Sequence, residues 1–351
     1  MSESALFEKT PFTIVADDDS GKHWAGRPEE LRRIHRIVKR LGKRDECSLD
    51  VIWANFGAGK SHTLFYLSHQ LETQNAGNVC VIIEIPEQVK NFLELYQRIA
   101  RKLPFDFIAG KLLECDRQQQ SDDLQKAARA IEHGGAGERD LAIQWLSGER
   151  PDLRKLRQAI GIGTRIEKDA IAADTLSSII HALNTGNTRL CIMLDEFQRI
   201  GKLSERSRSQ INSSLRTLLT KNPRNFSLFF AISSKIEQTA MNCIPEELRS
   251  IMGMQKPVTL PTMDETEAVE FVRDRMRYYR PKDYQGDDFA PLGDVAVKTA
   301  VKKIVDSKKV DLIPRTILQT LGYLYDEIDE TNAPLDQSEV QEILEDLNWN
   351  G

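Results

Sequence analysis

The segment Ala54-Asn55-Phe56-Gly57-Ala58-Gly59-Lys60-Ser61 constrains the fold of this chain more than any other part of the sequence. It lies between an apolar run at 49–54 and a helical pattern at 61–72, and its last four positions fit the phosphate-binding pattern GxxxxGK[ST]. Gly57 and Gly59 allow the backbone N–H groups to turn inward around phosphate oxygens. We therefore expect Lys60 to reach the β- and γ-phosphates of a nucleotide and the Ser61 hydroxyl to hold Mg²⁺.

The match to the pattern is incomplete at its first position, where Ala54 replaces the usual glycine. This residue begins the loop and is not the one closest to phosphate, so the departure is modest. The alternative interpretation, a chance glycine turn at the start of a helix, is disfavoured because a strand precedes the segment and a helix follows it.

Apolar runs that alternate with helical patterns predict an α/β fold with a parallel sheet covered on both faces. The expected strands are 49–54, 79–85, 190–194, 227–232 and 257–260. The expected helices between them include 31–41, 61–72, 92–103 and 175–183.

The chain of 351 residues is long enough for about two domains. We predict an N-terminal segment at 1–23, a nucleotide-binding core at 24–261 and a small all-helical lid domain at 262–351. The core contains a charged stretch with recurring helical patches, which we interpret as a helical insertion at about 104–174. In the lid domain we expect helices near 264–279, 293–306, 315–329 and 337–347.

Two adjacent carboxylates, Asp195 and Glu196, follow the apolar run at 190–194. A strand that ends in this way fits a Walker B element, in which Asp195 holds Mg²⁺ and Glu196 acts as the general base that orients the attacking water. Alone the pair could be a solvated strand end, but together with the upstream loop it favours nucleotide hydrolysis.

With these residues in hand, the sequence resembles an AAA+ ATPase over about residues 20–330, with a P-loop core and a helical lid. Gly26 and Arg27 open a segment similar to the "GRxxEL" box that contacts adenine in initiator-like members. The strand at 227–232 leads to Ser234, our choice for the sensor 1 polar residue, with Ser233 as its close rival. The resemblance implies ATP and Mg²⁺ as cofactors, and the nucleotide-binding set is Gly26, Arg27, Asn55, Phe56, Gly57, Ala58, Gly59, Lys60, Ser61 and His62.

Two arginines complete the resemblance. Arg249 precedes the last expected strand, where the family often carries an arginine finger that stabilises transition-state charge in a neighbouring subunit. Arg216 and Arg224 are other candidates for this finger. Arg315, in Ile313-Pro314-Arg315, looks like the sensor 2 arginine that reaches back to the nucleotide from the lid.

The position of the insertion limits which branches of the family the chain resembles. Lys60 and Asp195 are 135 positions apart, and initiator and transposition-regulator ATPases carry extra helices in this interval. The segment 86–91 lacks the aromatic-apolar-Gly pore loop of unfoldases, and the 21 residues after 330 are too few for a winged helix. The chain therefore resembles compact regulators of the TnsC/IstB kind, with phage-defence AAA+ proteins that share a similar Gly59-Lys60-Ser61-His62 loop as the second candidate.

Charge and targeting patterns limit the partners. The net charge of −5 excludes a uniformly basic protein that coats nucleic acid. Two basic stretches, Arg32–Arg44 and Arg199–Arg224, could still contact the phosphates of duplex DNA, although either could be an ordinary solvated face. The sequence contains neither an apolar run of about 18 residues nor a secretory signal, so we expect no membrane span and a cytoplasmic location.

Two functional hypotheses follow. In the first, ATP assembles the chain into a homo-oligomeric ring or filament, probably on DNA, that recruits a protein partner such as a transposase, a nuclease or another effector, and hydrolysis disassembles it. In the second, the chain is a scaffold that binds nucleotide with little turnover. The set Lys60, Asp195, Glu196 and Arg315 favours the first.

Overall fold

The computed structural model describes residues 6–75, 77–115, 120–253, 255–328 and 334–347. Its contacts divide the chain into two compact units. We call Ile37–Trp53 together with Gln70–Pro257 the sheet unit. Met1–Arg36, Ala54–His69 and Val258–Gly351 form the lid unit.

The strands of the described residues form one sheet in the order β2-β3-β4-β1-β5. Their bounds are β1 Ser48–Ala54, β2 Val79–Glu84, β3 Leu190–Asp195, β4 Phe226–Ser233 and β5 Val258–Leu260. β3 pairs in parallel with both neighbours, so that Leu190 lies opposite Val79 on one side and Phe226 on the other. The predicted parallel α/β fold is confirmed, and each predicted strand agrees with the observed one to within a residue at either end.

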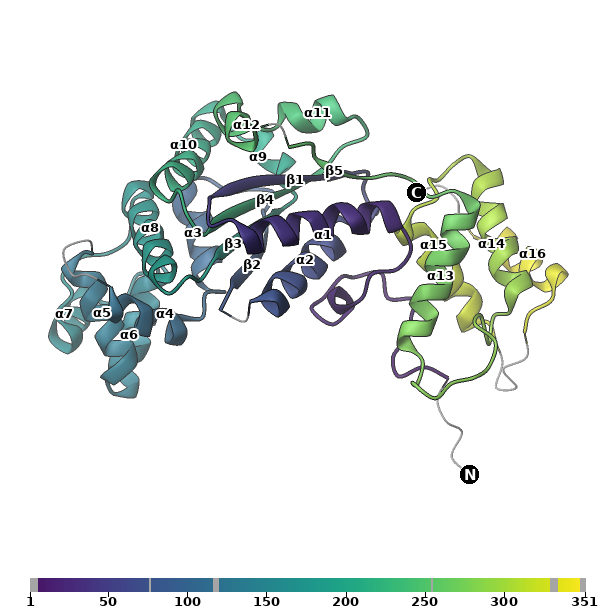
Figure 1. Ribbon diagram of the computed structural model, residues 1–351, viewed down its shortest axis with the longest axis horizontal. Helices are drawn as coiled ribbons and strands as arrows, with labels where there is room; N and C mark the ends of the chain where they lie inside the picture. The colour runs from purple at the N-terminus through teal and green to yellow at the C-terminus, as the bar shows by residue number, and fades with distance from the viewer. Residues whose placement is uncertain (1–5, 76, 116–119, 254, 329–333, 348–351) are drawn as a thin grey trace. The chain divides into compact units, whose positions relative to one another are not determined.

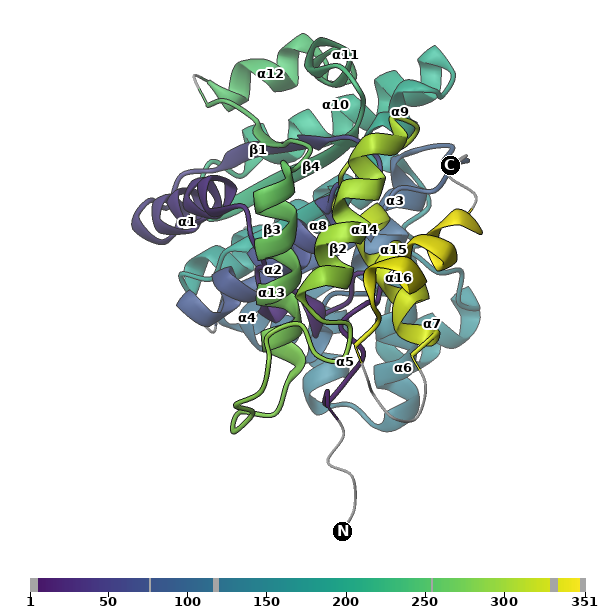
Figure 2. The ribbon, with the colours of Figure 1, turned by 90° about the vertical axis from the view of Figure 1, so that its right-hand side faces the viewer.

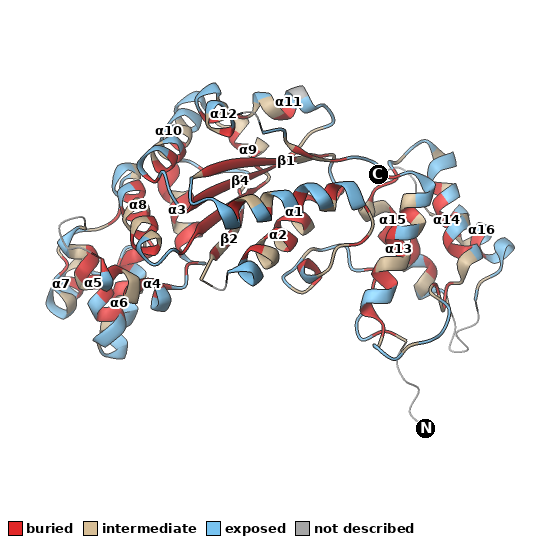
Figure 3. Cartoon of the chain, viewed as in Figure 1, coloured by how far each residue is buried: buried red, intermediate tan, exposed pale blue. Residues whose placement is uncertain are grey.

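The strands form because each is an apolar run that can be buried on both faces. Every residue of β3 is buried, and Figure 3 shows the strands red along most of their length. α3 (Phe92–Ala100) packs against β2 in the sheet unit, and α1 (Pro28–Lys43) and α2 (Lys60–Gln74) precede and follow β1 in the chain (Figures 1 and 2). The chain moves one way along the sheet from β1 to β2 and then reverses to β3, so right-handed crossovers predict that the connections before and after β2 cover opposite faces.

Helices α3, α8 (Asp169–Thr185) and α10 (Glu205–Lys221) pack against one another in the sheet unit. The short helices α9 (Gln198–Gly201), α11 (Glu237–Asn242) and α12 (Glu246–Met252) follow β3 and β4.

The interval 104–174 is helical in its described residues. It holds α4 (Phe105–Glu114), α5 (Asp122–His133), α6 (Ala136–Leu146) and α7 (Leu153–Ile160). Each of these helices packs against the next, and α4 also packs against α8. Buried Trp145 donates its indole N–H to the Thr164 carbonyl (2.9 Å), and the Ser121 hydroxyl caps α5. The buried apolar residues of the inserted helices belong to the same hydrophobic core cluster as those of the strands.

The lid unit has its own hydrophobic core, formed by α13 (Glu265–Tyr279), α14 (Asp294–Ser307), α15 (Pro314–Asp326) and α16 (Gln337–Glu345). The N-terminal segment joins this core through Phe7 and Phe12. Arg275 fixes the same segment by donating to the carbonyls of Pro11 (2.5 Å) and Thr13 (2.8 Å). The end of the helix predicted at 315–329 reaches residue 329, which lies outside the described residues.

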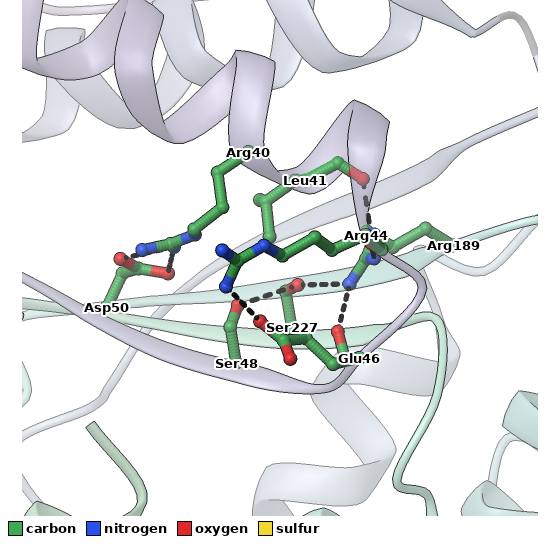
Figure 4. A network of polar contacts seen from close by, with 8 residues as sticks. All are labelled: Arg40, Leu41, Arg44, Glu46, Ser48, Asp50, Arg189 and Ser227. Atoms are coloured by element: carbon green, nitrogen blue, oxygen red, sulfur yellow. Dashed lines mark hydrogen bonds and ion pairs between the residues drawn. The ribbon is translucent and has the colours of Figure 1, made fainter. Parts of the chain in front are cut away.

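A network of polar contacts closes the end of the sheet where β3 begins (Figure 4). Arg189 is buried and donates to the carbonyls of Leu41 (3.4 Å), Arg44 (2.5 Å) and Glu46 (3.1 Å), and to the hydroxyl of Ser227 (2.9 Å). Its guanidinium thus satisfies carbonyls that the end of α1 and the turn after it leave open. None of the helices in the described residues is long and apolar enough to cross a membrane.

Candidate nucleotide-binding site

The phosphate loop, Ala54–Ser61, has glycine where its backbone requires glycine. Gly57 and Gly59 have φ values of 80° and 100°, in the left-handed region that other residues rarely adopt. A Cβ on Gly57 would also lie 3.0 Å from Ile313 and 3.1 Å from the Cβ of Arg315. Ala54, in contrast, is the last residue of β1 and is fully buried, so its methyl group belongs to the strand and leaves the loop unobstructed.

The helix after the loop begins at Lys60, so the free N–H groups and the positive end of the α2 dipole point toward the loop. Lys60 is buried, and its ammonium group donates to the Asn55 carbonyl (3.3 Å). Ser61 is partly exposed at the first turn of the helix. Both residues therefore sit where a phosphate-binding loop needs them.

His62 faces away from the loop toward the N-terminal segment. Burial lowers the pKa of His62 to about 4, so its imidazole is neutral, and Nε2–H donates to the Ser20 carbonyl (3.0 Å). The ring also lies 5.9 Å from that of Trp24. In this structure His62 anchors the segment before α1 to helix α2.

Arg27 supports the phosphate loop by donating a hydrogen bond to its backbone. It donates to the carbonyls of Ala58 (2.5 Å) and Pro261 (2.5 Å), and burial lowers its pKa to about 10, which leaves it charged at neutral pH. Gly26, with φ at 59°, donates its N–H to Asp274 (3.0 Å). The resemblance assigned Gly26 and Arg27 to adenine contact, whereas the guanidinium here contacts the loop backbone and the end of β5.

The start of α15 meets the phosphate loop within the lid unit. The Arg315 N–H donates to the Gly57 carbonyl (3.3 Å), and the guanidinium carbon lies over the Phe56 ring, 4.4 Å from its centroid. Asn55 donates its side-chain N–H to Asp311 (3.2 Å) just before the helix. The structure thus brings the predicted sensor 2 arginine to two successive residues of the loop, Phe56 and Gly57, and brings Asp311 to the residue before them.

The carboxylate pair lies at the end of β3 in the sheet unit. Asp195 is buried and accepts a hydrogen bond from the Glu196 N–H (2.8 Å). Glu196 has φ at 56°, and its carboxylate accepts from the Ser233 hydroxyl (3.0 Å) and from the Gln198 side-chain amide (2.7 Å). Gln198 in turn accepts from the Ser233 N–H (2.9 Å), which closes a ring of three residues.

The two candidate sensor 1 serines have different partners. The Ser233 hydroxyl contacts Glu196, as described above, whereas the Ser234 hydroxyl donates to the Ile236 carbonyl (3.0 Å) and accepts from its N–H (3.3 Å). The geometry therefore favours Ser233, the rival, as the polar neighbour of Glu196.

Sequence reasoning missed Gln198 and Arg199, which begin α9 two and three residues after Glu196. Arg199 donates to Glu84 (2.7 Å) and to the Ile85 carbonyl (2.6 Å), and its Nε lies 3.8 Å from the Glu196 carboxylate. A polar and a cationic residue two and three positions after the carboxylate pair were the available signal.

Arg249 lies in α12 and is partly buried, and its Nε has no hydrogen-bond partner in the described part of the chain. Of the other two finger candidates, Arg216 is exposed on α10, and Arg224 forms an ion pair with Asp45 (3.6 Å). A cavity of about 910 Å³ lies between α9, α10, α11 and α12 and is lined on one side by Gln198 and Ser233.

Within the described residues, no group of three His, Cys, Asp or Glu side chains could hold a metal ion. Magnesium in nucleotide sites needs only one or two protein ligands, because phosphate oxygens and waters complete its octahedron. Ser61 in the lid unit and Asp195 in the sheet unit each carry a group of the kind that Mg²⁺ accepts as a ligand.

Comparisons with known proteins identify one family match and several solved structures of similar fold. A family model described as the BREX system ATP-binding protein BrxC/D matches residues 113–234, a stretch that includes Asp195 and Glu196 but not the phosphate loop. The structure resembles ORC2 from Aeropyrum pernix, solved as ADPNP-ADP complexes, with a TM-score of 0.58, 13% identity, and coverage of 97% of this chain and 72% of that one. It also resembles Aeropyrum pernix ORC1 in complex with DNA, with a TM-score of 0.53, 13% identity, and coverage of 98% and 70%.

No curated protein matches the sequence. The structural likenesses establish that the chain has the AAA+ fold, in which a helical region follows the sheet. The predicted AAA+ resemblance is confirmed at that level, and the narrower resemblance to TnsC/IstB regulators stays a prediction.

Proposed function

We propose that the chain is an ATP-binding and ATP-hydrolysing AAA+ switch. The observation that carries the proposal is the phosphate loop itself, which has two glycines in left-handed conformations, a lysine at the following helix start, and an arginine from α15 against it. These are the parts that a site for a nucleoside triphosphate requires.

The roles follow from the chemistry of each group. The loop N–H groups bind the α- and β-phosphates, Lys60 reaches the β- and γ-phosphates, and Ser61 and Asp195 hold Mg²⁺. When bound, Mg²⁺ neutralises charge on the phosphate oxygens. Glu196 orients and deprotonates the attacking water, and Ser233 holds the carboxylate in position.

Assembly and DNA contact extend the proposal. Arg249 acts as the finger in a neighbouring copy of the chain, which makes hydrolysis depend on a ring or filament. Most basic side chains of the Arg32–Arg44 stretch are exposed on or just after α1, and those of α10 include exposed Arg206, Arg208 and Arg216. These surfaces suit the phosphates of duplex DNA, and one structural relative was solved in complex with DNA.

The protein partner defines the pathway. A transposition regulator that recruits a transposase is the first alternative, and a subunit of a phage-defence system that works with a nuclease or another effector is the second. The BrxC/D match favours the second, because it covers the carboxylate pair and most of the helical insertion. A nucleotide-binding scaffold with little turnover is the remaining alternative.

Glu196→Gln tests the switch. We expect this variant to bind ATP but to release no phosphate, and to remain in the ATP-assembled state when particles are imaged with and without duplex DNA. Glu132→Gln, at an exposed position on α5, is the matched control and should behave as the unaltered chain does. A Glu196→Gln protein that stays monomeric with ATP would refute assembly, and an unaltered chain that binds ATP without turnover would favour the scaffold.

A further inference from the structure

Phe56 is an exposed aromatic residue in the middle of the phosphate loop. Its side chain is 65% exposed, although burial of a phenyl ring stabilises the folded state. Its close partner is the guanidinium of Arg315, whose central carbon lies 4.4 Å from the ring centroid. An arginine over the face of a ring at this distance is attracted by the negative face of its π-system.

The contact holds the cation without using its hydrogen-bond donors. Among the residues that the structure describes, no carboxylate or carbonyl accepts from the Arg315 guanidinium, and its backbone N–H alone donates, to Gly57. A guanidinium has five N–H donors in its plane. The ring therefore fixes the position of the charge while the donors remain available for a ligand.

The backbone around this pair is fixed as well. A Cβ on Gly57 would lie 3.0 Å from Ile313 and 3.1 Å from the Arg315 Cβ, so the loop and the start of α15 approach as closely as glycine allows. Only the long side chain of Arg315 remains to be ordered, and ordering a free arginine costs rotamer entropy. A ring that restrains it beforehand reduces that cost when a phosphate binds.

We propose that Phe56 is a positioning residue that holds Arg315 over the phosphate loop and thereby makes the site prefer ATP to ADP. This inference rests on the proposed function. The loop N–H groups contact phosphates that both nucleotides carry, whereas a second cation over the same loop interacts most with the additional charge of the terminal phosphate. Removal of the ring should therefore weaken ATP binding and leave ADP binding nearly unchanged.

The test compares the dissociation constants of ADP and a non-hydrolysable ATP analogue for the unaltered chain, Phe56→Leu, Phe56→Tyr, Arg315→Ala and the double variant. A cation–π contact is worth a factor of about 2 to 30 in an equilibrium constant, so Phe56→Leu should weaken binding of the ATP analogue by at most that factor. Phe56→Tyr keeps the ring and should restore the affinity. The double variant should bind the analogue no more weakly than Arg315→Ala does, because both changes remove the same contact.

Phe107→Leu is the matched control, since this ring is 41% exposed on α4 in the sheet unit. It should alter neither affinity. Because Phe56 is mostly exposed, we expect its variants to keep the thermal unfolding midpoint, which the same samples report.

Two results would overturn the inference while the proposed function stands. One is an equal loss of ATP and ADP affinity in Phe56→Leu, which would indicate that the ring supports the loop or the nucleotide directly. The other is losses from Phe56→Leu and Arg315→Ala that multiply in the double variant, which would show that the residues act separately. An unaltered chain that binds neither nucleotide would overturn the proposed function and the inference with it.

Discussion

Two adjacent serines at the end of β4 allow a sharp test of the hydrolytic site. The Ser233 hydroxyl donates to the Glu196 carboxylate (3.0 Å), whereas the Ser234 hydroxyl closes a local turn with Ile236. Ser233→Ala and Ser234→Ala each remove one hydroxyl from neighbouring positions. They differ in whether that hydroxyl holds the proposed general base.

The magnitude follows from the hydrogen bonds that remain. A hydrogen bond to a charged group contributes about 1.5–3 kcal/mol, which corresponds to a factor of about 10 to 150 in rate if all of it serves the transition state. Gln198 still donates to Glu196 (2.7 Å) in the Ser233→Ala variant, so the carboxylate keeps one of its two hydrogen bonds. We therefore expect the lower end, about a tenfold fall in kcat.

Steady-state phosphate release as a function of ATP concentration separates kcat from KM. Ser233→Ala should lower kcat and leave KM within about twofold, because Glu196 acts on the attacking water and not on the bound phosphates. Ser234→Ala should change both constants less than about twofold. A larger loss of kcat in Ser234→Ala than in Ser233→Ala would refute the assignment of Ser233 and restore Ser234 as the sensor 1 residue.

Two further predictions concern stability. Arg189→Met leaves three backbone carbonyls without their donor, so it should lower the free energy of unfolding in urea by about 3 kcal/mol, whereas Arg129→Met on the exposed face of α5 should change it by less than about 0.5 kcal/mol. Burial lowers the pKa of His23 below its usual 6.5, so the unfolded chain binds a proton on this residue at a higher pH than the folded chain does. Stability should therefore fall as the pH drops below about 6.5, and His23→Gln should reduce that fall when thermal unfolding is compared at pH 7 and pH 5.

The strands were predictable because burial leaves a direct trace in the sequence. All of β3 is buried, and the chain accordingly has an unbroken apolar run there, bounded by Arg189 and Asp195. The short helix α9 has no such trace, since four residues are too few for a helical period. The sequence also predicted no packing partner for the N-terminal segment. Its packing against α13 depends on Arg275, which is more than 250 positions away along the chain.

Within the candidate site, the residues with a fixed sequence pattern were predictable and their partners were not. Lys60 and Asp195 follow from motifs that encode local backbone geometry. The distinction between Ser233 and Ser234 depends on where β4 ends, because successive side chains of a strand point to opposite faces. The partners of Arg27 depend on contacts across the fold, with Ala58 and Pro261 far along the chain.

The backbone at Glu196 explains how two adjacent carboxylates can have separate tasks. If β3 continued as a strand, the side chains of Asp195 and Glu196 would point to opposite faces of the sheet. The chain instead adopts φ at 56° at Glu196, a conformation that costs a non-glycine residue on the order of 1 kcal/mol or more.

Hydrogen bonds from Ser233 and Gln198 to the carboxylate hold this conformation, together with the Glu196 N–H donated to Asp195. A solvated strand end would not need hydrogen bonds that hold a strained backbone conformation. The strain at Glu196 is therefore independent support for a positioned base, because it does not depend on any motif and would persist if the resemblance to AAA+ proteins were set aside.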